Sequence, residues 1–178
     1  PRVVAVGDTM RADALLLLQQ TWPDATYVPG ATVLAPLRMR KEPDEVEALR
    51  RAAATADAAV HGAVRASHPG TTGLEVARAA DEAFRQAGAP EVLATIVAGG
   101  PNSAFPHHHS GLRPLQAGEP VLFDLGSRVD GYCSDITRMA FLGSPSPRYR
   151  EIHGIVADAA AAALEGIRPG SPISAVDL

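Results

Sequence analysis

Hydrophobic positions along the chain recur with two different periods, and these periods predict a mixture of helices and strands. Short apolar runs bounded by glycine and proline are typical of strands, whereas longer segments with apolar residues three or four positions apart are typical of helices. Strands are predicted over residues 3–6, 25–28, 92–98, 121–126 and 132–141, and helices over residues 11–20, 43–67, 72–88 and 147–166. The expected fold class is therefore α+β.

Local signals place the ends of several helices. Pro43 suits a first helical turn, and the acidic residues that follow it complement the positive end of the helix dipole. Thr72 and Glu75 form a capping box at the start of the next helix. A similar pair, Ser174 and Asp177, predicts another helix start just before the chain ends. Because proteins rarely end by opening a helix, we expect this chain to be a piece of a longer protein.

The beginning of the chain predicts a strand, a helix and a second strand, a unit too small to bury its own faces. Residues 29–43 are punctuated by proline and partly basic, which is typical of a linker or domain boundary. We therefore predict two parts, a remnant of a larger domain at the start of the chain and a second part that follows this linker or boundary.

The segment VLFDLGSRVDGYCSDITR, residues 121–138, predicts a β-hairpin. Asp130-Gly131 is a good two-residue turn, because both central positions of such a turn require positive φ. If the hairpin closes there, Val129 faces Tyr132, and the same register continues along both strands.

This register gives the hairpin one acidic face. Gly126 lies opposite Asp135, and Asp124 lies opposite Thr137. Since paired positions, and positions two apart on a strand, share a face, Asp124 and Asp135 are predicted to be diagonal neighbours. Gly126 has no side chain and leaves space between them.

Two carboxylates on one face repel each other unless a cation or a proton lies between them. Oxygen donors of this kind suit hard or borderline divalent metals. The alternative is a hairpin with two solvated aspartates, and the local pattern leaves both interpretations open. Cys133 shares the face in this register, although a lone cysteine is more often a small apolar filler.

Three consecutive histidines, His107, His108 and His109, follow a Gly-Gly-Pro-Asn turn. Histidine can bind a metal, position a substrate or transfer a proton near neutral pH. The alternative for any one of them is a place in an exposed polar loop. The other histidines, at 61, 68 and 153, lie on predicted helices or at their ends, where surface or capping roles are expected.

Composition excludes several classes of protein. The formal net charge is −4 and no basic stripe is present, so nucleic-acid binding is not expected. The longest apolar run, residues 14–18, is too short to span a membrane, and no signal peptide is apparent. A single cysteine excludes an internal disulfide and fits a reducing compartment, so we expect a cytoplasmic protein.

Two strings, GGPNSAFPHHH (residues 99–109) and GEPVLFDLGSRVDGYCSDITR (residues 118–138), together resemble the pita-bread metallopeptidases. That family includes aminopeptidase P, prolidase, methionine aminopeptidase and creatinase. RKEPDEVEALRRAA resembles the entry into their catalytic domain, and IRPGSPISAVD resembles the segment after the next long helix. The resemblance implies the first half of a pita-bread catalytic domain over residues 38–178, preceded over residues 1–37 by the remnant of a creatinase-like α/β N-terminal domain with its linker. That remnant favours the Xaa-Pro-cleaving members.

The resemblance also implies a site. Asp124 and Asp135 match two metal ligands of a dinuclear centre that holds manganese, cobalt or zinc. His107 matches a histidine that contacts the substrate or stabilises the tetrahedral intermediate. The implied substrate is a peptide with proline at its second position, and the implied reaction is hydrolysis of the bond beside proline by a metal-activated water.

One departure from the family pattern has a consequence for activity. The family's remaining ligands, a histidine and two glutamates, would follow Leu178, so we expect the chain as given to be inactive. The alternative to an enzyme is a non-catalytic pita-bread module that binds peptides or proteins. A half-domain would also expose an apolar face that could recruit a second copy, so a homo-oligomer is a further expectation.

Overall fold

The computed structural model describes residues 2–176, which form two compact units. One unit extends to Ala48 and the other begins at Leu49. The domain boundary predicted between residues 37 and 38 stays a prediction. The compact units are defined by contacts within this chain, and such contacts do not test which family domain each part belongs to. The two units are described separately below.

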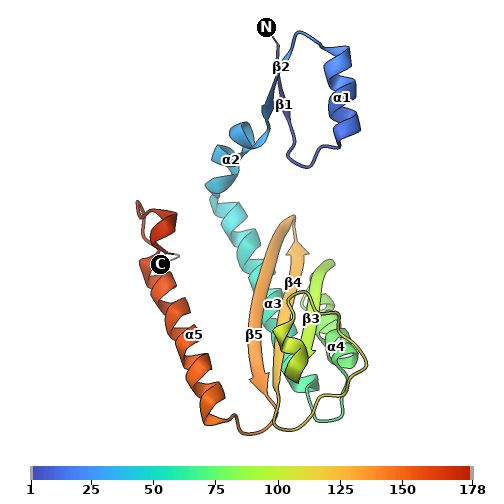
Figure 1. Cartoon of the computed structure of the whole chain (residues 1–178), viewed down its shortest axis with the longest axis vertical. Coiled ribbons are helices and arrows are strands. Elements are labelled where there is room, and N and C mark those ends of the chain that lie inside the picture. Colours follow the sequence, from blue (N-terminus) through green and yellow to red (C-terminus); the bar gives the residue numbers. More distant parts are fainter. Residues whose placement is uncertain (1, 177–178) are drawn as a thin grey trace. The chain divides into compact units, whose positions relative to one another are not determined.

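The first unit contains a small parallel sheet (Figure 1). Its elements are β1 (Val3–Val6), α1 (Ala12–Thr21), β2 (Thr26–Pro29), α2 (Ala31–Met39) and the first residues of α3 (Pro43–Ala66). Val3 pairs with Thr26 and Val6 with Pro29, and α1 connects the two strands. The predicted strand–helix–strand unit is therefore confirmed.

Residues 29–43, predicted as a linker or domain boundary, contain helix α2, which was not predicted from the sequence. Pro36 lies inside this helix. A proline removes one backbone hydrogen bond, but Val33, Leu34 and Leu37 still recur at helical spacing. The prolines of this segment favoured a linker, although the apolar residues have the spacing of a helix.

The second unit is a three-stranded antiparallel sheet with helices, in the strand order β3-β4-β5. Its elements are the rest of α3, α4 (Gly73–Gln86), β3 (Glu91–Gly99), the 3-10 helix η1 (Gly100–Ala104), β4 (Pro120–Val129), β5 (Tyr132–Phe141), α5 (Pro147–Gly166) and the 3-10 helix η2 (Ile173–Ala175). The strands and long helices predicted for this part of the sequence are all present, and the predicted α+β class is confirmed.

The core of the second unit lies between the sheet and helices α3 and α4, which cover one face of it (Figure 1). An alanine stripe on α3 supplies one side of this core through Ala52, Ala56, Ala59 and Ala63. Their small side chains let the helix approach closely to the large residues of the sheet. Those large residues include Val97 on β3 and Val121, Phe123 and Leu125 on β4, and α4 adds Val76 and Phe84.

A buried chain of hydroxyl groups crosses this apolar layer. Thr55 of α3 lies 2.8 Å from the Ser127 hydroxyl, which lies 3.0 Å from the Ser134 hydroxyl of β5. Because buried polar groups are costly unless they are hydrogen-bonded, these three residues favour one alignment of α3, β4 and β5 over neighbouring ones.

The capping box predicted at the start of α4 is confirmed. The Glu75 amide donates to the Thr72 hydroxyl, and the Glu75 carboxylate accepts from the Thr72 amide. Ser146 caps α5 by accepting from the Tyr149 amide. The predicted cap between Ser174 and Asp177 depends on a residue that lies outside the described residues. None of the helices described in residues 2–176 is long and apolar enough to cross a membrane.

Replacing Gly62 with alanine is expected to lower the free energy of unfolding by about 1–3 kcal/mol. The added methyl group would lie 2.7 Å from Cβ of Ala83 and 3.2 Å from the carbonyl oxygen of Ala79, where α3 meets α4. Gly154→Ala in α5 is the matched control, since open space surrounds that position, and it should be neutral or stabilising by up to about 1 kcal/mol. Urea unfolding measures both, and equal effects would contradict the close helix contact.

Candidate functional site

The β4–β5 hairpin closes in the predicted register. Val129 pairs with Tyr132, and the pairing continues to Pro120 opposite Phe141. Asp130 and Gly131 form the turn with φ values of 50° and 84°. Both values are positive, as the two-residue turn requires, so the prediction of the turn is confirmed.

The hairpin directs its two predicted metal-ligating aspartates to the face that α3 and α4 do not cover. Asp124 pairs with Thr137, and Gly126 pairs with Asp135. Their neighbours Phe123 and Leu125 point into the core, so Asp124 and Asp135 lie on the opposite side of the sheet. Asp124 is half-buried and Asp135 is exposed.

One contact on this face holds a carboxylate in place. The Thr137 hydroxyl donates to Oδ1 of Asp124 at 3.1 Å. The sequence placed Thr137 opposite Asp124, but the role of its hydroxyl was missed. Directly opposed residues on neighbouring strands have close side chains, and this general rule could have suggested the hydrogen bond.

Gly126 keeps the space between the two aspartates open. A Cβ at this position would lie 2.9 Å from the backbone carbonyl oxygen of Ser134, a separation that real side chains do not tolerate. The close approach of the two backbones therefore requires glycine. It leaves no side chain between Asp124 and Asp135.

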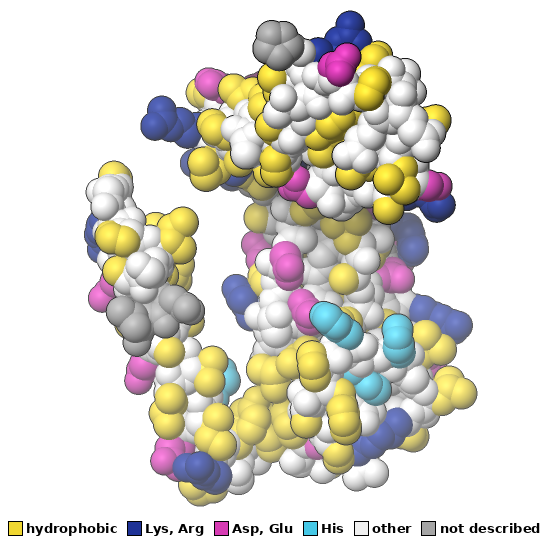
Figure 2. Space-filling view, turned by 45° about the horizontal axis from the view of Figure 1, so that its top comes forward, with side chains coloured by type: hydrophobic (Ala, Val, Ile, Leu, Met, Phe, Trp, Pro, Cys, Tyr) yellow, Lys and Arg dark blue, Asp and Glu magenta, His cyan; other side chains and the backbone are white. Residues whose placement is uncertain are grey.

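The three consecutive histidines lie on the loop between β3 and β4, just after η1. His107 and His109 are exposed and His108 is half-buried, and His107 has a positive φ of 56°. On the face shown in Figure 2, histidine side chains lie beside acidic ones, next to an area of hydrophobic side chains.

The residues in this neighbourhood do not complete a metal centre. Within residues 2–176, no group of three or more histidine, cysteine, aspartate or glutamate side chains is arranged to hold a metal ion. Asp124 and Asp135 present carboxylate oxygens on one face of the hairpin, and two such donors would fit only part of the ligand shell of a divalent metal. Cys133 is exposed and reduced, at the position opposite Arg128.

Comparison with known proteins identifies the family. The sequence profile of metallopeptidase family M24 matches residues 47–178, about three quarters of the chain. The chain belongs to metallopeptidase family M24. As a family of metallopeptidases, M24 proteins act on peptides and depend on a divalent metal. The family predicted from the two strings around Asp124 is confirmed.

The M24 chain is also similar to individual proteins. It is 38% identical over 142 residues to an uncharacterized peptidase of Staphylococcus aureus strain USA300, covering 79% of this chain and 40% of that protein. The crystal structure of dipeptidase PepE from Mycobacterium ulcerans has 37% identity and a TM-score of 0.86, covering 90% of this chain and 43% of that one.

Two further similar solved structures are named as a prolidase and an Xaa-Pro dipeptidase. The prolidase from Pyrococcus furiosus has 29% identity and a TM-score of 0.82, over 91% of this chain and 48% of its own. The Xaa-Pro dipeptidase from Bacillus anthracis has 32% identity and a TM-score of 0.83, over 92% of this chain and 47% of its own. The M24 chain therefore spans less than half the length of the relatives it matches.

Replacing Gly126 with alanine is expected to destabilise the M24 chain by about 1–3 kcal/mol, because the methyl group would meet the backbone of β5. Urea unfolding measures the loss, and the control is again Gly154→Ala. Cross-strand nuclear Overhauser effects between residues 124 and 137 should also weaken. An unchanged hairpin in the Gly126→Ala variant would show that the two strands do not approach as closely as described.

Proposed function

We propose that this M24 chain contributes part of the active site of a proline-specific peptidase, of the Xaa-Pro dipeptidase or aminopeptidase P type. The observation that carries the proposal is the common face of Asp124 and Asp135, fixed by the continuous β4–β5 register. The names of the similar prolidase and Xaa-Pro dipeptidase support the choice of proline at the second position of the substrate.

Asp124 and Asp135 would hold divalent metal in this proposal. Two ions of manganese, cobalt or zinc would polarise the scissile carbonyl group and lower the pKa of a bound water. The protein's part is to present the two carboxylates on one face of the hairpin, with Gly126 leaving no side chain between them. The continuous strand pairing supports that role, and so does the hydrogen bond from Thr137 to Asp124.

His107 would contact the substrate. It is exposed on the loop after η1, so its imidazole is accessible to a peptide. A neutral or protonated imidazole can donate a hydrogen bond to a developing oxyanion, which stabilises charge as it forms in the transition state. The adjacent hydrophobic area in Figure 2 would accept the apolar parts of a substrate.

We also propose that the 178-residue chain is inactive by itself. Asp124 and Asp135 are two donors, and the residues described here add no third ligand beside them. A catalytic divalent ion in proteins usually has at least three protein ligands and an open position. The rest of the ligand shell, and a general base, would have to come from outside residues 2–176.

The last part of the proposal concerns the cellular location of the protein and its association with other chains. Cys133 is free and exposed, which suits a reducing, cytoplasmic location. Helix α5 exposes Ile152, Ile155, Val156 and Leu164, which would favour association with a second copy or with another segment that covers them.

Manganese is expected to raise the melting temperature of the chain through Asp124 and Asp135. At a manganese concentration 100 times the Kd, binding to the folded state adds about 2.7 kcal/mol of stability. The Asp124→Asn, Asp135→Asn double variant should fold without metal and lose the manganese-dependent shift. Calorimetric titration of both proteins gives the stoichiometry, and Asp158→Asn on α5 is the matched control. Equal manganese binding in the double variant would reject the proposed ligands, whereas a peptide-binding module would bind no metal in either protein.

Thr137→Val is expected to weaken manganese binding by about 10- to 100-fold, because a hydrogen bond that orients a ligating carboxylate is lost. Thr137→Ser keeps a hydroxyl group and should bind manganese nearly as well as the wild type. Both variants are compared by the same calorimetric titration. Similar affinities for the valine and serine variants would show that the hydroxyl does not orient Asp124 for a metal.

A further inference from the structure

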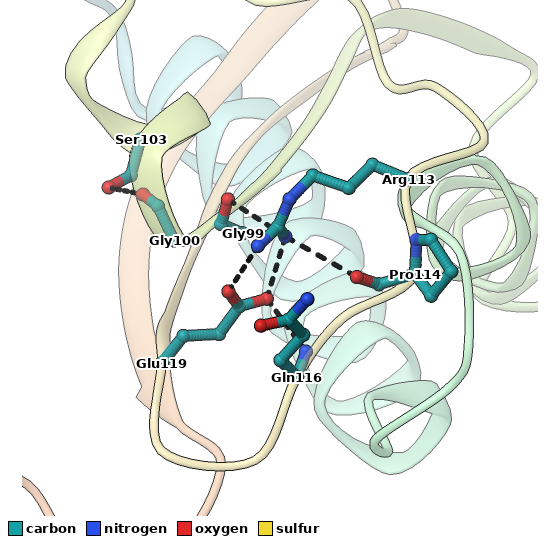
Figure 3. Close-up of polar contacts among 7 residues, drawn as sticks. All are labelled: Gly99, Gly100, Ser103, Arg113, Pro114, Gln116 and Glu119. Carbon is teal, nitrogen blue, oxygen red and sulfur yellow. Dashed lines mark hydrogen bonds and ion pairs between the residues drawn. The ribbon is translucent and has the colours of Figure 1, made fainter.

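The loop that carries the histidines is closed at its base by an ion pair (Figure 3). Arg113, from the middle of the loop, binds Glu119, which directly precedes β4, through both ends of its guanidinium group. Nη1 donates to Oε1 at 2.9 Å and Nη2 donates to Oε2 at 2.7 Å. The Glu119 side chain is 11% exposed and that of Arg113 is 33% exposed. Neither residue was singled out in the sequence.

The same two side chains also hold the backbone around them. Nη1 of Arg113 lies 3.5 Å from the carbonyl oxygen of Gly99 and 3.4 Å from that of Pro114. Oε1 of Glu119 accepts a second hydrogen bond from the Gln116 amide at 2.8 Å. The pair therefore joins the end of β3, the middle of the loop and the start of β4.

The backbone at the end of β3 is built to accept this pair. A Cβ at Gly99 would overlap the side chain of Leu115, and one at Gly100 would overlap the carboxylate of Glu119. Gly100 also has a positive φ of 55°, which glycine adopts without strain. The Arg113–Glu119 pair thus lies directly against the first residues of η1, the helix that leads to His107.

The return half of the loop is attached to its surroundings by backbone hydrogen bonds. The Leu115 amide donates to the carbonyl oxygen of Thr71, and the Gly70 amide donates to the carbonyl oxygen of Leu115. Nearer the histidines, the Ser110 hydroxyl accepts from the Val97 amide at 2.9 Å. The segment from 101 to 109 is therefore held between a fixed return path on one side and the ion pair on the other.

Stability alone does not account for a charged pair at this position. Two charges removed from water lose hydration, so a shielded ion pair often stabilises a fold no better than apolar residues of similar size. A fork-to-fork pair between arginine and a carboxylate does provide a fixed mutual geometry, which apolar packing does not. Its benefit is therefore expected in the placement of the segments that it joins.

We propose that the Arg113–Glu119 pair positions the 101–109 segment, and with it His107, for contact with the substrate. This inference rests on the proposed function, which makes His107 a substrate-contacting residue. Arg113 and Glu119 are positioning residues, because they act through the backbone of Gly99, Gly100 and η1.

The surroundings of Glu119 favour the ionised form of the pair near neutral pH. The hydrogen bond from the Arg113 guanidinium lowers the pKa of the Glu119 carboxyl, and the Gln116 amide lowers it further, against the opposing effect of burial. A lowered folded-state pKa gives stability that is complete above the usual glutamate pKa of about 4.3 and is lost as the pH falls through the lowered value. The positioning effect is therefore constant near neutral pH.

Arg113→Lys tests the proposal, because lysine keeps the positive charge and loses the two-pronged geometry. Hydrogen exchange of the amides in residues 101–109 is expected to accelerate by about tenfold or more, whereas exchange in α4 should change by less than about twofold. The imidazole resonances of His107 and His109 should shift, while those of His61 on α3 and His153 on α5 should not. Arg148→Lys is the matched control, since Arg148 forms an exposed ion pair with Glu151 on α5.

Kinetics provide an independent measurement in a form of the protein that supplies the remaining metal ligands. Arg113→Lys should reduce kcat by about 10- to 100-fold with unchanged metal stoichiometry, because a small displacement of a positioned group has a large effect on rate. If the wild type does not hydrolyse Xaa-Pro peptides, the proposed function fails, and the exchange measurement still decides whether the pair orders the loop.

Two outcomes would overturn the positioning role. Unchanged exchange and unchanged histidine resonances in Arg113→Lys would show that the pair does not order the loop. Acceleration by the same factor in α4 and in residues 101–109 would show that the pair only stabilises the whole unit. Should the lysine variant fail to fold, Glu119→Gln, which keeps an acceptor for Arg113, provides the second measurement by the same criteria.

Discussion

The register of the β4–β5 hairpin determines on which side of the sheet each functional side chain lies. Side chains alternate between the two faces of a strand, so a slip by one residue would move Asp124 into the core and Phe123 into solvent. The turn at Asp130-Gly131 fixes this register from one end, through its two positive φ values. The buried hydroxyl chain through Ser127 fixes it again from within the core.

The sheet divides structural and chemical roles between its faces. Its covered face packs on the alanine stripe of α3 and on Val76 and Phe84 of α4, and apolar burial there stabilises the second unit. Its other face carries Asp124 and Asp135, which are more exposed than the buried residues Phe123 and Leu125 and do not pack in the core. A carboxylate pair on an open face is consistent with the chain's membership of a metallopeptidase family, because carboxylate oxygens are common ligands of divalent metals.

The loop between β3 and β4 combines accessible histidines with a rigid base. His107 is exposed, yet a few residues away Arg113 and Glu119 form a shielded, two-pronged ion pair against the backbone of Gly99. Functional loops on rigid scaffolds commonly combine accessibility at the tip with order at the base. The chain covers less than half of its relatives' length, and the proposed centre would need more ligands than Asp124 and Asp135.

The sequence by itself determined the hairpin, its register and the common face of Asp124 and Asp135, because a two-residue turn and a period of two are local properties. It also determined the capping box at Thr72, which depends on two residues three positions apart. Composition did not reveal helix α2, which forms around Pro36 within residues 29–43.

Only the tertiary structure revealed the Arg113–Glu119 pair and the hydrogen bond from Thr137 to Asp124. It also decided which face of the sheet the helices cover. The physical reason is that these features depend on where a loop or a helix returns in three dimensions, and local periodicity does not encode that position. The contact of Thr137 is an intermediate case. The strand register predicted that Thr137 lies opposite Asp124, and only the side-chain geometry showed the hydrogen bond between them.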